Sequence, residues 1–452
     1  SRMYAAGVTC SDCHDPHSLK LRAPGDEMCL SCHRGQSLDS PAHHHHPQES
    51  AGARCVGCHM PVKNFMQVDA RHDHSFRIPR PDLSVEFGVP NVCTSCHAER
   101  DAGWAAAQVT EWYGETRNPG LQTWARTFYR ARDGNPDAVP DLIALALDAD
   151  QPAIARATAA RAVSDWLTPE VVDALITLTK ASDARIRRAA VDAMRDLPLN
   201  HRLRLIAPAL EDDVRSVRIT AVDALQNGPG PSQNASAAQR DLGLGPFEDL
   251  MRSAPAARAV SEYREALEID ADRPDGQVAI AVDAHARGDF AGAASAYEEA
   301  IRIASGDPVA VVNLADLMRQ LGEEQPAGVL LQNTLLATQS PDVAHAYGLW
   351  LVRAGQTDAA IAYLRAAAEG APENPRYGYV LAVALDAQGK KSEARRVAEQ
   401  VLKAHPWHYQ TLAALVVWGQ QQGHSVSIFT ERYRRLRQIE RVGEWCWSSD
   451  RS

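Results

Sequence analysis

The stretch CSDCH at residues 10–14 is followed by three further copies of one pattern: CLSCH at 29–33, CVGCH at 55–59 and CTSCH at 93–97. In each copy two cysteines stand three positions apart, and a histidine follows the second directly. C-x-x-C-H is the pattern at which haem c is attached, because both thiols add to the porphyrin's vinyl groups and the histidine then binds the iron. The four copies use eight of the nine cysteines, so we expect four covalently attached haem c groups here.

The predicted attachment residues are the thiol pairs of the four copies: Cys10, Cys13, Cys29, Cys32, Cys55, Cys58, Cys93 and Cys96. The predicted proximal iron ligands are the histidines that end each copy: His14, His33, His59 and His97. The competing interpretation of C-x-x-C pairs is a zinc ribbon or a redox dithiol. A histidine directly after every pair argues against it.

Spare histidines surround the motifs. Eleven of the 17 histidines lie in the first hundred residues, and seven remain after the proximal four: His17, His43, His44, His45, His46, His72 and His74. For distal iron ligands we favour His43 or His44 together with His46, and His74 over His72. His17 is too close to His14 to reach the far face of the same haem, so as a ligand it would serve a neighbouring one. Alternatives are a solvated loop or tag remnant at 43–46, and axial methionines.

A surplus of histidines favours electron transfer over catalysis. An iron with two histidine ligands has no open position for a substrate, and the chain contains no C-x-x-C-K variant. The leading hypothesis is therefore an electron carrier, not an enzyme, in which four bis-His haems form a wire. One alternative is a haem enzyme that reduces a small nitrogen or sulfur oxyanion at an open iron. Another is a repeat-based assembly factor whose haems only stabilise a small domain.

Charge and hydropathy limit which partners and which cellular location we expect. The 452 residues carry a net charge of −10 and no basic stripe, which argues against nucleic acid and suits docking to redox protein partners. No run of 18 apolar residues predicts a transmembrane segment. Because haem c is attached outside the cytoplasm, we expect an exported protein, periplasmic or extracellular. The missing initiator methionine and leader suggest a trimmed, mature form.

The fold predicted from these patterns is mainly α. Residues 1–100 have too few aliphatic side chains for an ordinary core, so we expect a tetrahaem domain wrapped around its haems, with short helices at the motifs and loops elsewhere. From residue 101 an Ala-rich helical pattern begins, with Trp104, Val109 and Trp112 as a buried stripe. The segment 101–226 is predicted to be a helical domain.

Two kinds of internal repeat follow. ARIRRAAVDAM (184–194) and RSVRITAVDAL (215–225) align at a period of 31, with a poorer copy at 153–163, and resemble HEAT repeats. Residues 227–247 are rich in Gly, Pro, Ser and Asn and are predicted to be a linker. Over 248–424 the turn glycines recur at intervals of 33 or 34: Gly288, Gly322, Gly355, Gly389 and Gly423.

Small residues follow those glycines at Ala293, Ala327, Ala360 and Ala394. A helix–turn–helix unit of this length with small packing residues resembles the tetratricopeptide repeat. Each unit buries its apolar face on its neighbours, so an α-solenoid is expected. Residues 425–452 are predicted to form a capping helix and a tail that contains Cys446.

The haem segment resembles the multihaem cytochrome c superfamily that includes pentahaem nitrite reductases, hydroxylamine oxidoreductases and small tetrahaem carriers. The resemblance covers about residues 1–120. It rests on GVTCSDCHDPHS (7–18), on the histidines before CVGCHMP (55–61), and on HDHSFRIPRPD (72–82). The resemblance implies a specific form of the electron-carrier hypothesis in which the protein associates with itself, since some members polymerise into extracellular conducting helical filaments. The solenoid would then be a scaffold or sheath.

Overall fold

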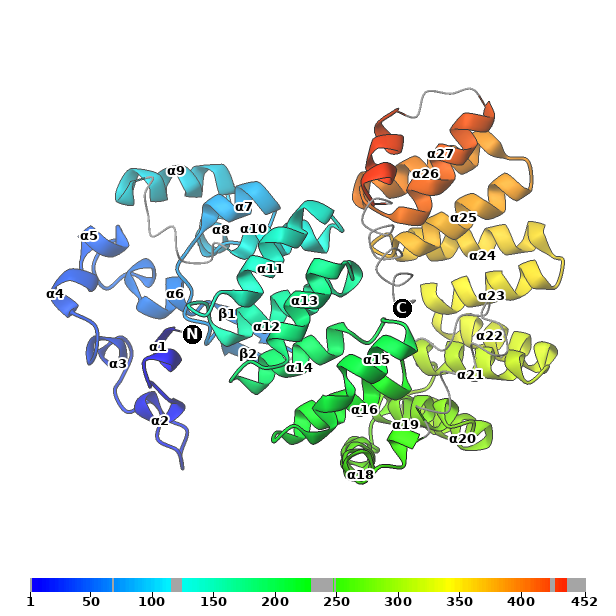
Figure 1. Ribbon diagram of the computed structural model, residues 1–452. Coiled ribbons are helices and arrows are strands. Elements are labelled where there is room, and N and C mark those ends of the chain that lie inside the picture. The colour runs from blue at the N-terminus through cyan, green and yellow to red at the C-terminus, as the bar shows by residue number, and fades with distance from the viewer. Residues whose placement is uncertain are drawn as a thin grey trace. The chain divides into compact units, whose positions relative to one another are not determined.

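The computed structural model describes residues 2–66, 69–114, 124–228, 247, 249–422 and 427–436. The chain divides into two compact units, Ser1–Gln122 and Thr123–Ser452. The prediction of a mainly α protein with helical repeats is confirmed (Figure 1). The sequence predicted that a helical domain begins at residue 101. The structure instead includes the first helix after that point, α9 (Ala102–Tyr113), in the first unit.

The first unit consists of very short helices, one hairpin and one longer helix. In chain order its elements are α1 (Arg2–Ala5), α2 (Cys10–Cys13), α3 (Glu27–Leu30), α4 (Gly35–Leu38), α5 (Pro41–His44), the 3-10 turn η1 (Ala51–Ala53), α6 (Cys55–His59), β1 (Val62–Phe65), β2 (Asp69–His72), α7 (Pro81–Phe87), α8 (Val92–Cys96) and α9. Each attachment motif overlaps a short helix, as expected: α2, α3, α6 and α8.

The hairpin was not expected from the sequence, which predicted loops between the motifs. Strands β1 and β2 pair antiparallel, with Val62 opposite His72 and Phe65 opposite Asp69. Every residue of both strands is exposed, so the alternation of buried and exposed positions that usually indicates a strand is missing. The guanidinium of Arg71 lies 4.7 Å from the centre of the Phe65 ring. His72, one of the spare histidines, is the last residue of β2.

Little apolar surface is buried within the first unit. Among the described residues its buried hydrophobic side chains are Ala53, Leu83, Ala105 and Val109. By contrast, Leu19, Leu21, Val62, Phe65 and Met66 are exposed and lie in segments next to the motifs. A protein segment of this size does not fold on so small a core. The unit therefore has apolar surface in the places where a large flat cofactor would cover it.

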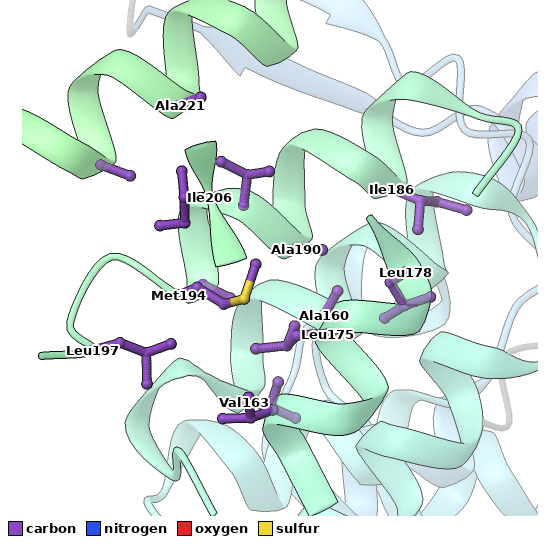
Figure 2. Close-up of a cluster of buried hydrophobic side chains, with 14 of the residues drawn as sticks. Ala160, Val163, Leu175, Leu178, Ile186, Ala190, Met194, Leu197, Ile206 and Ala221 are labelled. Carbon is purple, nitrogen blue, oxygen red and sulfur yellow. The ribbon is translucent and has the colours of Figure 1, made fainter. Parts of the chain in front are cut away.

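The second unit is built entirely of helices in its described part. Its first half contains α10 (Trp124–Arg132), η2 (Pro136–Ala138), α11 (Val139–Leu147), α12 (Ala153–Ala162), η3 (Val163–Asp165), α13 (Pro169–Leu178), α14 (Ala184–Ala193), α15 (Leu199–Leu205), η4 (Ala207–Glu211) and α16 (Arg215–Gln226). Side chains from these helices point toward one another in one core (Figure 2). Positions related by the 31-residue period are buried alike: Ile186 and Val217, Met194 and Leu225.

The repeated aspartates at this period link neighbouring repeats. Asp192 accepts a hydrogen bond of 2.7 Å from Arg161, which lies 31 residues earlier, and one of 2.8 Å from Arg195. Arg195 also binds Asp223. The periodic pattern thus corresponds to a ladder of ion pairs beside the shared core.

The second half continues as antiparallel helix pairs from green to red in Figure 1. They are α18 (Ala254–Ile269), α19 (Pro274–Ala286), α20 (Phe290–Ile303), α21 (Pro308–Gln320), α22 (Glu324–Thr338), α23 (Pro341–Arg353), α24 (Thr357–Gly370), α25 (Pro375–Ala387), α26 (Lys391–Ala404) and α27 (Tyr409–Gln422). The first four turn glycines have φ between +75° and +84°, a conformation that a side chain disfavours. The alanines five residues later are at most 2 % exposed. Gly423 and Cys446 lie outside the described residues.

The two kinds of repeat share one core. Ala256, Ala259 and Tyr263 of α18 pack into the same cluster as α11–α16. Glu262 of α18 also forms two hydrogen bonds with the buried guanidinium of Arg218 on α16. Most of the predicted linker at 227–247 lies outside the described residues, but the helices on either side of it belong to one compact unit. In the described part of the chain, no helix combines the length and apolarity needed to cross a membrane.

Candidate haem-binding site

The cysteines of three motifs project from one turn of helix, whereas in the second motif Cys29 lies on α3 and Cys32 lies two residues beyond its end. Residues three apart on a helix share a face, so Cys10 and Cys13 on α2, like Cys55 and Cys58 on α6, present both thiols to the same side. Cysteines of all four motifs are free thiols that are partly or fully exposed. They are therefore accessible for thioether formation.

Neighbouring motifs lie close together. The carboxylate of Asp26, which precedes the second motif, accepts 2.9 Å and 3.2 Å hydrogen bonds from the Arg54 side chain and the Cys55 backbone N–H. Burial and the negative charge of Asp26 raise the pKa of the Cys55 thiol to about 12. Burial, followed by the nearby Cys93 and Cys96, raises the pKa of Cys58. The second motif thus adjoins the third, and the third adjoins the fourth.

Two proximal histidines have a fixed tautomer. The Nδ1 atom of His14 lies 2.9 Å from the carbonyl oxygen of Leu19, and that of His59 lies 2.7 Å from the carbonyl oxygen of Arg77. A carbonyl oxygen only accepts hydrogen bonds, so Nδ1 carries the proton in both rings. The Nε2 lone pair is then free, which is how metal-binding histidines are usually held.

Three of the predicted proximal histidines lie opposite a spare histidine, with similar distances between the ring centres. The ring centres of His14 and His74 are 6.3 Å apart, and those of His46 and His97 are 6.1 Å apart. His43 and His59 are 6.2 Å apart with only 9° between their planes. A metal–imidazole bond is about 2 Å long, so two rings on opposite sides of one metal ion have centres roughly 6 Å apart. All three pairs fit two axial ligands of an iron.

Backbone carbonyls also fix several of the spare histidines. Nδ1 of His46 donates to the His44 carbonyl over 2.5 Å, Nδ1 of His74 to the His72 carbonyl over 2.8 Å, and Nδ1 of His72 to the Met60 carbonyl over 2.7 Å. Each of these rings keeps its Nε2 lone pair for a metal. Burial, followed by the nearby His59, lowers the pKa of His43, which favours the neutral form that a ligand needs.

His44 is held in the opposite tautomer. Its Nδ1 accepts a 3.2 Å hydrogen bond from the His46 backbone N–H, so the ring proton is on Nε2. A protonated Nε2 cannot bind iron. Of the two alternatives that the sequence left open, His43 and His44, the geometry favours His43.

The site residues are not all brought together. Among the described residues, the structure places no histidine ring opposite His33 at this distance, and His17 is an exposed residue of the turn after the first motif. No group of three His, Cys, Asp or Glu side chains in the described part of the chain is arranged to hold a metal ion. Paired rings without a third ligand suit a haem iron better than zinc, which takes four ligands.

Helix α9 is the part of the site that sequence reasoning missed. Its Trp104, Val109 and Trp112 were expected to form one buried stripe of the next domain. Val109 is buried, but the Trp104 ring lies 5.0 Å from that of His97, and the Trp112 ring lies 4.3 Å from that of His45. The signal available was the position of the helix, which begins five residues after the fourth motif.

Three protein families match parts of the chain. Residues 3–38 match the doubled CXXCH motif, 139–226 match HEAT repeats, and 284–349 and 351–416 match the tetratricopeptide repeat. The predictions of haem attachment motifs and of both kinds of repeat are confirmed in these ranges. The third and fourth motifs lie beyond the matched doubled motif.

Among characterised proteins, the chain is similar to the multihaem cytochrome MtrA of Shewanella baltica (strain OS185). The two are 30 % identical over 112 residues, which are 24 % of this chain and 29 % of that protein. The chain thus spans under a third of the length of this relative.

Solved structures similar to the chain cover well under half of it. MamA from Desulfovibrio magneticus RS-1 is 18 % identical over 37 % of this chain and 95 % of its own, with a TM-score of 0.31. A tetratricopeptide repeat protein from Parabacteroides merdae ATCC 43184 is 13 % identical over 39 % of this chain and 68 % of its own, with a TM-score of 0.30.

Proposed function

We propose that this protein transfers electrons through four covalently attached haem c groups, each with two histidine ligands. The chain joins multihaem c-type attachment motifs to HEAT and tetratricopeptide repeats. Haem supplies an iron that cycles between the ferric and ferrous states. The chain holds it through the eight motif cysteines and through axial histidines. This assignment extends the two-motif match to all four copies.

The observation that carries the proposal is the spacing of the three histidine pairs. Rings at 6.1–6.3 Å would hold a haem iron from both sides, and an iron held in this way would have no place for a substrate. We assign His74 to the site of His14, His43 to that of His59, and His46 to that of His97. For the site of His33 the chain offers His17 and His72, and Nε2 of His72 is free because Nδ1 donates to Met60.

The pairs interlock the motifs. His74 precedes the fourth motif in sequence but faces the first motif's His14, and His43 and His46, three residues apart, face the third and the fourth. Short loops therefore tie several sites together. Such closeness favours electron transfer from one site to the next over loss to solvent.

We further propose an exported protein, periplasmic or extracellular, that associates with redox protein partners and with itself. In this account the solenoid is a scaffold and docking surface, because helical repeats present extended protein-binding faces. Polymerisation into a helical filament would need a contact between copies that does not close into a ring. Electron microscopy of the haem-loaded protein tests this form, and only monodisperse particles would contradict it.

A second candidate function is reduction of a small nitrogen or sulfur oxyanion. One observation favours it: the structure sets no ring opposite His33 among the described residues, so this site could be open. Stopped-flow spectra of the reduced protein separate the two functions. An electron carrier reoxidises with an oxidised cytochrome and stays reduced with nitrite, nitrate or sulfite. Turnover of any of these three would instead favour the enzyme.

A further inference from the structure

The four-histidine run at 43–46 is held against the C-terminal end of α9. The rings of His45 and Trp112 are stacked, with centres 4.3 Å apart and 7° between their planes. Tyr113 meets the His45 ring edge-on at 5.6 Å, and its hydroxyl donates a hydrogen bond to the backbone carbonyl of His43. Two consecutive aromatic residues of α9 thus contact the run through a ring and through the backbone.

His45 also determines the direction of the chain. It follows the last residue of α5 and has φ +56°, a left-handed conformation that histidine adopts more readily than most residues. The chain therefore turns sharply between His43 and His46. This turn lets two residues only three positions apart face different motifs, His43 toward His59 and His46 toward His97.

The side chain of His45 differs from those of its neighbours in what it faces. His43 and His46 face predicted proximal histidines, and the His43 ring also lies 6.4 Å from that of Tyr113. The ring contacts of His45 in the described part of the chain are with Trp112 and Tyr113 of α9. Its Nε2 atom is buried and has no hydrogen-bond partner in the described part of the chain. The flat stacking on Trp112 is a packing contact that any planar aromatic ring of similar size could make.

We propose that His45 is a positioning residue and not an iron ligand, and that its stacking on Trp112 fixes the turn that carries the ligands His43 and His46. This inference rests on the proposed function, in which those two histidines bind iron. Helix α9 is then a clamp on two neighbouring haem sites. Tyr113 contributes by holding the His43 backbone.

Paired substitutions in the full, haem-loaded chain separate a packing role from a ligand role. W112F and H45F keep an aromatic ring at each side of the stack, whereas W112L and H45N remove it. H45F cannot bind iron, and H45N keeps a residue that tolerates the left-handed backbone. The readouts are the high-spin ferric signal in electron paramagnetic resonance and the number of haems attached per chain.

If the stacking of His45 on Trp112 fixes the turn, W112F and H45F stay low-spin like the wild type. W112L and H45N then gain a high-spin signal equivalent to up to two haems in four. Loss of attached haem in W112L but not in W112F would also support the proposal. The proposal is overturned if H45F converts one haem to high spin, since His45 is then a ligand, or if W112L is unchanged. A wild type that is already largely high-spin would instead contradict the proposed function.

Discussion

The imidazole rings of His43 and His59 lie nearly parallel, with centres 6.2 Å apart and 9° between their planes. One belongs to the last turn of α5 and the other to the third attachment motif on α6. Two imidazole rings gain little from facing each other at that separation, because direct stacking would bring them closer. The haem iron that we propose between them would account for the spacing.

Replacing His43 should open one iron site. In H43A the ligand opposite His59 is lost, so we expect one haem in four to become high-spin and to bind carbon monoxide in the ferrous state. Added imidazole should restore the low-spin spectrum. The matched control is H285A, whose histidine bonds Gln320 within the solenoid and should leave the spectrum unchanged. An unaltered spectrum in H43A would remove His43 from the ligand set.

Gly52 should be irreplaceable because of His46. A Cβ atom at position 52 would lie 2.2 Å from Cδ2 of the His46 ring, whereas one at Gly35 would lie 3.7 Å from Leu30. We expect G52A to displace the His46 ring and to raise the high-spin fraction by about one haem in four, and G35A to resemble the wild type. Both glycines lie within the first unit, so folding and haem attachment can be compared directly. Equal spectra for the two variants would contradict the assigned position of His46.

The buried pair of Arg218 and Glu262 should hold α16 against α18. The two side chains are 4 % and 16 % exposed and form two hydrogen bonds, of 2.7 Å and 2.6 Å. E262A leaves the guanidinium buried without this partner, and we expect a loss of about 3 kcal/mol in the free energy of unfolding. Urea denaturation followed by helicity measures it. In the control E299A the exposed partner Arg302 stays hydrated, so little or no change is expected there.

Acid should destabilise the solenoid through His345. Burial, followed by the nearby positive charge of Arg376, lowers the pKa of His345 from 6.5 to about 4. Below pH 6.5 the unfolded chain takes up a proton that the folded chain refuses. The stability contributed by the neutral ring is therefore fully present above pH 6.5 and is lost as the pH falls toward 4.

H345F keeps the stacking on Tyr377, which lies 4.4 Å away, and removes the titration. The stability that the wild type loses between pH 7 and pH 5 should be smaller in H345F, while His408, whose pKa is also lowered to about 4, accounts for a remaining part. Unfolding free energies at the two pH values measure the difference. An identical loss in both proteins would show that His345 titrates normally.

The repeats could be predicted because their signals are local. A turn glycine such as Gly322 and the alanine five residues later are needed by each unit for its own turn and packing, so periodicity alone reveals them. The attachment motifs are equally local. The boundary of the first unit was harder, since α9 has the composition of the following helices but packs on α7 within the haem segment.

The distal ligands depend on geometry that no local pattern contains. His43 and His44 are equivalent in sequence, and what distinguishes them is the hydrogen bond from the His46 N–H to the His44 ring. That bond exists only because the chain turns at His45. The hairpin escaped prediction for a similar reason, since its strands are short and exposed on both faces.

The proposed electron transfer requires iron sites closed by two histidines each, and the spin state of the oxidised, haem-loaded protein tests this most directly. Low-temperature electron paramagnetic resonance, quantified against the haem content, should give four low-spin ferric haems per chain and no appreciable high-spin signal. A high-spin signal equivalent to one haem or more in the wild type would contradict the account and would favour an open, reactive site at His33.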